Sequence, residues 1–207
     1  TMQPVEPPND HRSVEWTTFN GPEEFGAAFR DWGMEVTQLR AETGEHWIAS
    51  SKLNNVQFWA THLTGRYRIR AGLPERMVLM QLDLGPSGTR CVGGAQLSKN
   101  DILVGFGRAQ LEGVLTGEHH GVSFIVPESI VLGALTARAP QAADLMRRPS
   151  PYVISYSGPG LDVLRRFVEA ALMPRGLPQE HFLANEILDA LIDALASSCH
   201  EEDLLAY

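Results

Sequence analysis

Positive charge gathers in one short stretch of this chain, "GRYRIRAGLPER" at residues 65–76, which holds four arginines. Arg66, Arg68 and Arg70 alternate with a tyrosine and an isoleucine, and alternate side chains of a β-strand point to the same face. We therefore expect three guanidinium groups on one face. Guanidinium groups bind phosphate through paired hydrogen bonds and stack on bases. The pattern predicts a local site for a small anionic ligand.

A second interpretation of the same arginines is a solvated strand face. In that case the arginines would pair with carboxylates on the barrel: Glu45, Glu75 or Glu112. Arg66 and Arg70 lie about 13 Å apart along an extended strand, close enough for two long side chains to converge on one ligand with two anionic groups. Residue types and spacing leave both interpretations open.

The charge of the whole chain limits what this stretch can bind. Lysine and arginine number 17 against 25 acidic residues, so the formal net charge of the 207 residues is −8. General nucleic-acid binding needs a broad basic surface, which this composition does not supply. No apolar run approaches the roughly 20 residues of a membrane span, and the start of the chain is not a signal peptide. Cys91 and Cys199 are expected to be reduced thiols, and the predicted location is the cytoplasm.

Other chemistry is poorly represented in the sequence. His119 and His120 follow Glu118, but adjacent residues of a strand point to opposite faces, so the two histidines cannot share one metal ion. His46 and His62 are isolated in the sequence, and we predict no metal and no cofactor. The chain has no G-x-S-x-G nucleophile elbow and no glycine-rich phosphate loop before a helix. We therefore predict that the chain is not an enzyme.

The elements that must position the arginines follow from the hydrophobic pattern. Residues 20–33 have an apolar stripe at helical spacing, with Asn20 as the expected N-cap and Gly33 as the C-terminal stop. Short β-rich runs separated by turn signals follow, at residues 35–40, 46–53, 56–63, 66–71, 77–84, 91–97, 101–106, 109–115 and 121–127. Helical periodicity returns in four later segments interrupted by one strand: 127–139, 139–148, 152–156 (strand), 157–173 and 178–198.

This order predicts a mainly β fold with added helices (α+β), an antiparallel β-barrel followed by an amphipathic helix pair. The expected organisation is a flexible leader at 1–16, a barrel at 17–156, a helical element at 157–198 and a tail at 199–207. The apolar surface of the last two helices is broad. It predicts either a helical cover for the barrel or a dimerisation surface.

The chain resembles the N-terminal regulatory domain of AraC-type transcription factors, a cupin-like barrel with a helical dimerisation element. The segments that carry the resemblance are "FNGPEEFGAAFRDWGMEVTQL" at 19–39, "SKNDILVGF" at 98–106, "VSFIVPESIVLGAL" at 122–135 and "LDVLRRFVEAAL" at 161–172. The resemblance implies transcription regulation, a small effector in the sensor domain and a homodimer through residues 160–198. AraC-type regulators bind DNA through a C-terminal helix-turn-helix region, which is absent from this chain.

"RYRIR" also resembles the R-x-x-x-R motif with which PilZ-type receptors hold cyclic di-GMP. By that resemblance Arg66 and Arg70 would contact the ligand, with Arg68 beside them. PilZ receptors carry a second motif, [D/N]-x-S-x-x-G. Here "SYSGPG" at 155–160 matches it from Ser157 to Gly160, with serine at the first position.

The predicted function is an effector-binding and dimerisation domain whose best candidate effector is cyclic di-GMP. Two alternatives remain: a sensor for another small polar metabolite or sugar, and a metal-dependent cupin enzyme. The enzyme would need three or four His or Glu ligands inside the barrel.

Overall fold

Ten β-strands form the centre of the protein in a computed structural model that describes residues 15–19, 21–40, 44, 46–83, 89–107, 109–147, 151–171 and 180–197. The strands are β1 (Glu15–Phe19), β2 (Glu35–Arg40), β3 (His46–Leu53), β4 (Val56–Gly72), β5 (Met77–Asp83), β6 (Thr89–Val92), β7 (Ala95–Leu97), β8 (Asp101–Phe106), β9 (Gln110–Pro127) and β10 (Tyr152–Ser155). All pairings are antiparallel. The predicted cupin-like, mainly β fold with added helices is confirmed.

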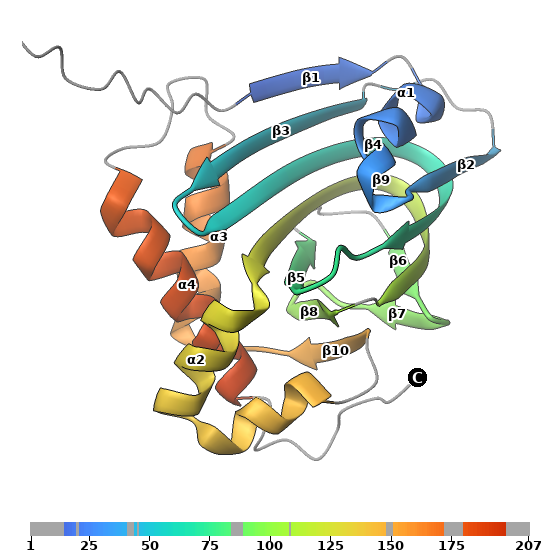
Figure 1. Ribbon diagram of the computed structural model, residues 1–207. Coiled ribbons are helices and arrows are strands. Elements are labelled where there is room, and N and C mark those ends of the chain that lie inside the picture. Colours follow the sequence, from blue (N-terminus) through green and yellow to red (C-terminus); the bar gives the residue numbers. More distant parts are fainter. Residues whose placement is uncertain are drawn as a thin grey trace, which may run out of the picture.

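Two long neighbouring strands hold this sheet together. β4 and β9 pair from Gln57 opposite Ile125 to Gly72 opposite Gln110. The first half of β4 also pairs with β3 and its second half with β2, while β9 pairs with β5 at one end and with β6 at the other. The same ladder therefore belongs to two walls, and the sheet curls into a barrel-like shape (Figure 1).

The predicted break between residues 63 and 66 is wrong, because β4 runs through it without a turn. Gly65 lies opposite Gly117, and both have positive φ angles, 129° and 87°. Glycine adopts such angles at little cost, so the pair bends both long strands while the ladder continues. The predicted strands at 109–115 and 121–127 are likewise parts of β9.

A hairpin replaces the single strand predicted at residues 91–97. β6 pairs with β7 around Gly93 and Gly94, whose φ angles are 57° and 91°. Two consecutive residues with positive φ are typical of the tight turns that match strand twist. The hairpin places Arg90 and Val92 on β6 beside β9.

The first helix closes one end of the barrel. α1 (Pro22–Ala28) and the 3-10 turn η1 (Arg30–Trp32) end at Gly33, which has the predicted left-handed conformation with φ 55°. Phe25 and Phe29 are buried, and the Phe29 ring lies 4.5 Å from that of Trp59 in β4. The helix begins after Gly21; the predicted N-cap Asn20 lies outside the described residues.

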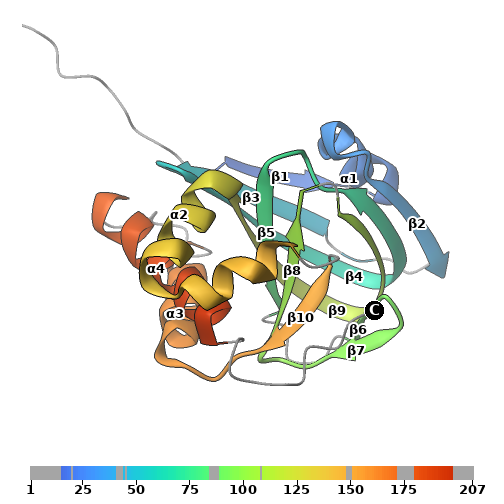
Figure 2. The same cartoon turned by 60° about the horizontal axis from the view of Figure 1, so that its bottom comes forward.

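The remaining helices pack on the outside of the sheet (Figure 2). They are α2 (Glu128–Arg138), the 3-10 segment η2 (Pro140–Arg147), α3 (Pro159–Ala171) and α4 (Glu180–Ser197). Phe167 of α3 lies 5.0 Å from Phe58 and 6.0 Å from Phe124, ring centre to ring centre. The expected helical cover is present, and most apolar residues of α4 from Ala184 onward are buried within it. No helix in the described ranges is long and apolar enough to cross a membrane.

Candidate functional site

The three predicted arginines lie on the outer face of β4. Arg66 and Arg70 are exposed and Arg68 is half-buried, whereas Tyr67 is buried and Ile69 lines the interior. Their common face is therefore as predicted. Even-numbered residues of β4 point outward, so the three arginines share the face of β4 that carries Phe58. Phe58 is covered by α3, and the arginines lie further along the strand, beyond that cover.

A fourth arginine joins this face from the neighbouring strand. Arg40 of β2 is exposed and is the direct cross-strand partner of Arg66. Side chains of directly opposed residues lie on the same side of a sheet. We define the arginine face as Arg40, Arg66, Arg68 and Arg70.

One carboxylate already lies between two of these arginines. Arg68 donates from Nε to Glu112 Oε1 over 2.8 Å and also pairs with that oxygen through its terminal nitrogen. Arg70 donates from Nε to Glu112 Oε2 over 3.2 Å. These hydrogen bonds lower the pKa of the half-exposed Glu112 carboxyl. The two guanidinium groups thus converge on a single anionic group.

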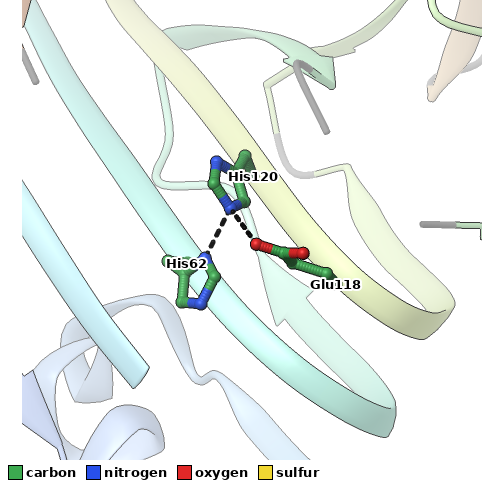
Figure 3. Close-up of side chains that lie close together, drawn as sticks. All are labelled: His62, Glu118 and His120. Carbon is green, nitrogen blue, oxygen red and sulfur yellow. Dashed lines mark hydrogen bonds and ion pairs between the residues drawn. The ribbon is translucent and has the colours of Figure 1, made fainter. Parts of the chain in front are cut away.

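Two histidines and a glutamate form a second cluster on the outer face (Figure 3). His62 Nδ1 lies 2.6 Å from His120 Nε2, and His120 Nε2 lies 3.0 Å from Glu118 Oε1. His62 and His120 are directly opposed in the β4–β9 ladder. As predicted, His119 points the other way and is buried inside.

No local pattern in the sequence indicates this cluster, because His62 lies 58 residues before His120. Only the register of two long strands brings His62 opposite His120. The alternation of Glu118 and His120 was visible, but no local signal indicates the partner strand.

The inside of the sheet holds a cavity of about 100 Å³. Its wall is mostly apolar and includes Phe29 of α1 and Trp59 of β4. The polar side chains in the wall are few: Thr61, Gln81, Arg90, His119 and Ser123. Trp59 lines this cavity, whereas its neighbour Phe58 packs against Phe167 on the other face of the sheet.

Arg90 is the unusual member of this wall. Its side chain is 1% exposed, and none of its three nitrogens has a hydrogen-bond partner. Burial lowers its pKa to about 10, against the opposing effect of Asp83 and Asp101, so the guanidinium is charged at neutral pH. Buried polar groups in native proteins nearly always have partners. An unsatisfied buried guanidinium in a cavity wall is therefore suited to an anion.

The two carboxylates near Arg90 have other contacts. Asp101 accepts hydrogen bonds from the Ser98 backbone N–H and the Ser155 hydroxyl, both over 2.6 Å. Asp83 Oδ2 lies 3.0 Å from His119 Nδ1, although not in hydrogen-bonding geometry. The charge of Arg90 is partly balanced by these groups, while its donors stay available to a ligand.

Arg90 was not singled out from the sequence. The sequence offers a weak signal for it, since Arg90 lies two residues before Val92 in a short alternating strand. In the structure both residues point inward. Its burial depends on β9 and β7 lying on either side of β6.

Comparison with known proteins gives a structural likeness and no sequence match. No protein-family model and no curated protein matches the chain. The AraC-like transcriptional activator CuxR superposes with a TM-score of 0.61 at 12% sequence identity, over 89% of this chain and 70% of CuxR. This likeness shows a shared fold.

Two further similar structures are more distant. ToxT from Vibrio cholerae, bound to (E)-4-(8-methylnaphthalen-1-yl)but-3-enoic acid, gives a TM-score of 0.46 at 12% identity, over 70% of this chain and 58% of ToxT. A predicted oxalate decarboxylase from Thermotoga maritima gives 0.32 at 12% identity, over 48% of this chain and 96% of that protein.

Proposed function

We propose that this chain is the effector-binding and dimerisation domain of an AraC-type transcription regulator. The fold shared with CuxR over 89% of the chain supports this assignment, together with the motifs quoted above. In this proposal DNA binding belongs to a helix-turn-helix region and to none of the described residues. The proposed location is the cytoplasm, where such a regulator meets both effector and DNA.

The proposed effector is cyclic di-GMP, bound at the arginine face through Arg66, Arg68 and Arg70. The observation that carries this proposal is the convergence of Arg68 and Arg70 on one point. The Glu112 carboxylate now lies there, as the alternative of a solvated strand face also predicts. A phosphate, like a carboxylate, is negatively charged and accepts paired hydrogen bonds from a guanidinium group. The ligand would replace Glu112 between Arg68 and Arg70, while Arg66 contacts its other end.

Calorimetry with cyclic di-GMP tests this proposal on the wild-type chain and on Arg66→Ala/Arg70→Ala. Each charged hydrogen bond lost costs about 1.5–3 kcal/mol, so affinity is expected to fall by roughly tenfold or more per arginine. Arg30→Ala is the control, because Arg30 is an exposed arginine of η1 outside the arginine face. Absence of heat with the wild type, or equal affinity in the double variant, would remove cyclic di-GMP from this face.

A second candidate effector is favoured by the unpaired guanidinium of Arg90. A cyclic dinucleotide is too large for the interior, because pockets for drug-sized ligands measure about 300–1,000 Å³. A cavity of about 100 Å³ with an apolar wall suits a small carboxylic acid instead. Its carboxylate would pair with Arg90 while its carbon chain contacts residues such as Trp59.

Thermal-shift measurements with a carboxylate series from acetate to benzoate test this second effector. A small apolar acid is expected to raise the melting temperature of the wild type and of Arg66→Ala/Arg70→Ala equally, since those arginines lie outside the cavity. No shift with any acid would exclude the interior site for this ligand class.

Dimerisation through residues 160–198 is proposed as the route by which the effector acts. The helices that would form the interface pack on β4, which carries Arg66, Arg68 and Arg70, and on its neighbour β9, which carries Glu112. An effector shifts the monomer–dimer equilibrium only if it binds monomer and dimer with different affinities. Sedimentation velocity with and without cyclic di-GMP measures this; an unchanged monomer–dimer balance would separate sensing from dimerisation.

The alternative of a metal-dependent cupin enzyme has less support. Among the described residues of the cavity wall, His119 is the one histidine, and its Nδ1 faces Asp83. Elemental analysis of the purified protein, followed by assays of any metal-loaded form, tests this alternative.

A further inference from the structure

The three side chains in Figure 3 present three possible metal-binding atoms to one point in space. His62 Nδ1, His120 Nε2 and Glu118 Oε1 all lie within 4.8 Å of one another. The His120 and Glu118 side chains are 30% and 47% exposed, so an ion can reach them from solvent. None of the three lines the interior cavity or belongs to the arginine face.

The backbone holds this arrangement in place. His62 and His120 are direct partners in the β4–β9 ladder, and Glu118 lies two residues before His120 on the same face of β9. Sites built on paired strands of a continuous sheet are positioned more precisely than sites on loops. The backbone therefore presents the ligands without any movement of a loop.

Neighbouring side chains orient the His62 ring. Its Nε2 lies 3.2 Å from Thr64 Oγ1, and its plane stacks on the Trp47 indole at 5.6 Å with an angle of 13°. When Nε2–H donates to the threonine hydroxyl, the Nδ1 lone pair is left facing His120. Histidines that bind metals characteristically donate their other ring N–H to such a partner.

We propose that His62, Glu118 and His120 bind a divalent transition-metal ion, with Zn²⁺ as the best match. Two imidazoles and one carboxylate suit zinc and its neighbours, whereas Mg²⁺ and Ca²⁺ prefer oxygen ligands alone. Three protein ligands leave a fourth tetrahedral position open to water or a ligand. The site lies outside the barrel, between the helical cover and the arginine face.

The distances are compatible with this ion after a small adjustment. Zn–N bonds of about 2.0–2.1 Å place neighbouring ligand atoms of a tetrahedron about 3.3 Å apart. The His62–His120 distance of 2.6 Å and the His120–Glu118 distance of 3.0 Å must therefore open by less than 1 Å. Small rotations of the His120 and Glu118 side chains, both of which reach solvent, supply movements of this size.

Titration of the metal-free full chain with Zn²⁺ and with Co²⁺ tests the proposal. We expect one equivalent to bind by calorimetry and Co²⁺ to give the visible absorption of a four- or five-coordinate ion. His120→Gln and Glu118→Gln should each weaken binding by at least about tenfold. Glu169→Gln is the control, since it removes an exposed carboxylate of α3 outside both the cluster and the arginine face.

Trp47 fluorescence supplies an independent test of where the metal ion binds. Because its indole stacks on His62, bound Cu²⁺ or Ni²⁺ should quench its fluorescence, and Trp47→Phe should remove that quenching while one equivalent still binds. Melting curves of every variant establish that each is folded.

Two results would overturn the proposal. One is absence of saturable Zn²⁺ and Co²⁺ binding by the wild type. The other is unchanged affinity in folded His120→Gln, which would assign the ion to other histidines. Neither result bears on effector binding, because the arginine face and Arg90 contribute no ligand.

Discussion

Replacing Arg90 with methionine is expected to stabilise the protein while removing its capacity to bind an anion in the cavity. Burial lowers the pKa of Arg90 from the ordinary value of an arginine to about 10, a value that already includes the opposing effect of Asp83 and Asp101. At about 1.4 kcal/mol per pKa unit, the charged guanidinium costs the folded state about 3 kcal/mol. Methionine fills similar space without that charge.

The sign of this effect follows from linkage. A base whose pKa is lower in the folded state destabilises the fold wherever it is charged in the unfolded chain. At pH 7 that condition holds for arginine. Removing the charge should therefore raise the free energy of unfolding by up to about 3 kcal/mol, or roughly 6–12 °C in melting temperature for a chain of this length.

Urea unfolding and thermal melts of the wild type, Arg90→Met and Arg66→Met provide the measurement. The exposed Arg66 is the control, and its replacement is expected to leave stability almost unchanged. A small carboxylate that stabilises the wild type should have no effect on Arg90→Met. A loss of stability in Arg90→Met would refute the reasoning, because it would mean that the guanidinium forms stabilising contacts in solution.

Three further predictions concern the arginine face, the helical cover and the cavity. Glu112→Gln removes the carboxylate from between two arginines and should tighten cyclic di-GMP binding in calorimetry; weaker binding would count against the arginine face. Phe167→Ala removes a buried ring from the helix–sheet interface and should cost about 3–5 kcal/mol in urea unfolding, with less than 1 kcal/mol arguing that α3 does not pack there. Gly121→Ala places a Cβ 2.7 Å from the buried His119 Nε2 and should lower the free energy of unfolding by about 1–3 kcal/mol. Gly133→Ala, in an open position of α2, should raise it by up to about 1 kcal/mol. Equal melting temperatures of the two variants would contradict this.

Periodicity was a good guide to the type of each element but not to where strands end. Gly65 and Gly117 look like turn residues in the sequence, yet in the structure they oppose each other inside one ladder. A glycine permits both a turn and a bend, and only the partner strand decides between them. Gly93 and Gly94 gave the opposite outcome, a true hairpin turn.

The chain's own residue pattern determined the mainly β fold with its helical additions, the left-handed end at Gly33 and the common outward face of Arg66, Arg68 and Arg70. These are local properties, because they depend on alternation and helical spacing within a few residues. The tertiary structure alone decided that Glu112 lies between two of those arginines, that His62 meets His120, and that Arg90 is buried without a hydrogen-bond partner. Each of these depends on the register between strands distant in sequence, and a shift of one residue would turn every one of those side chains to the other face.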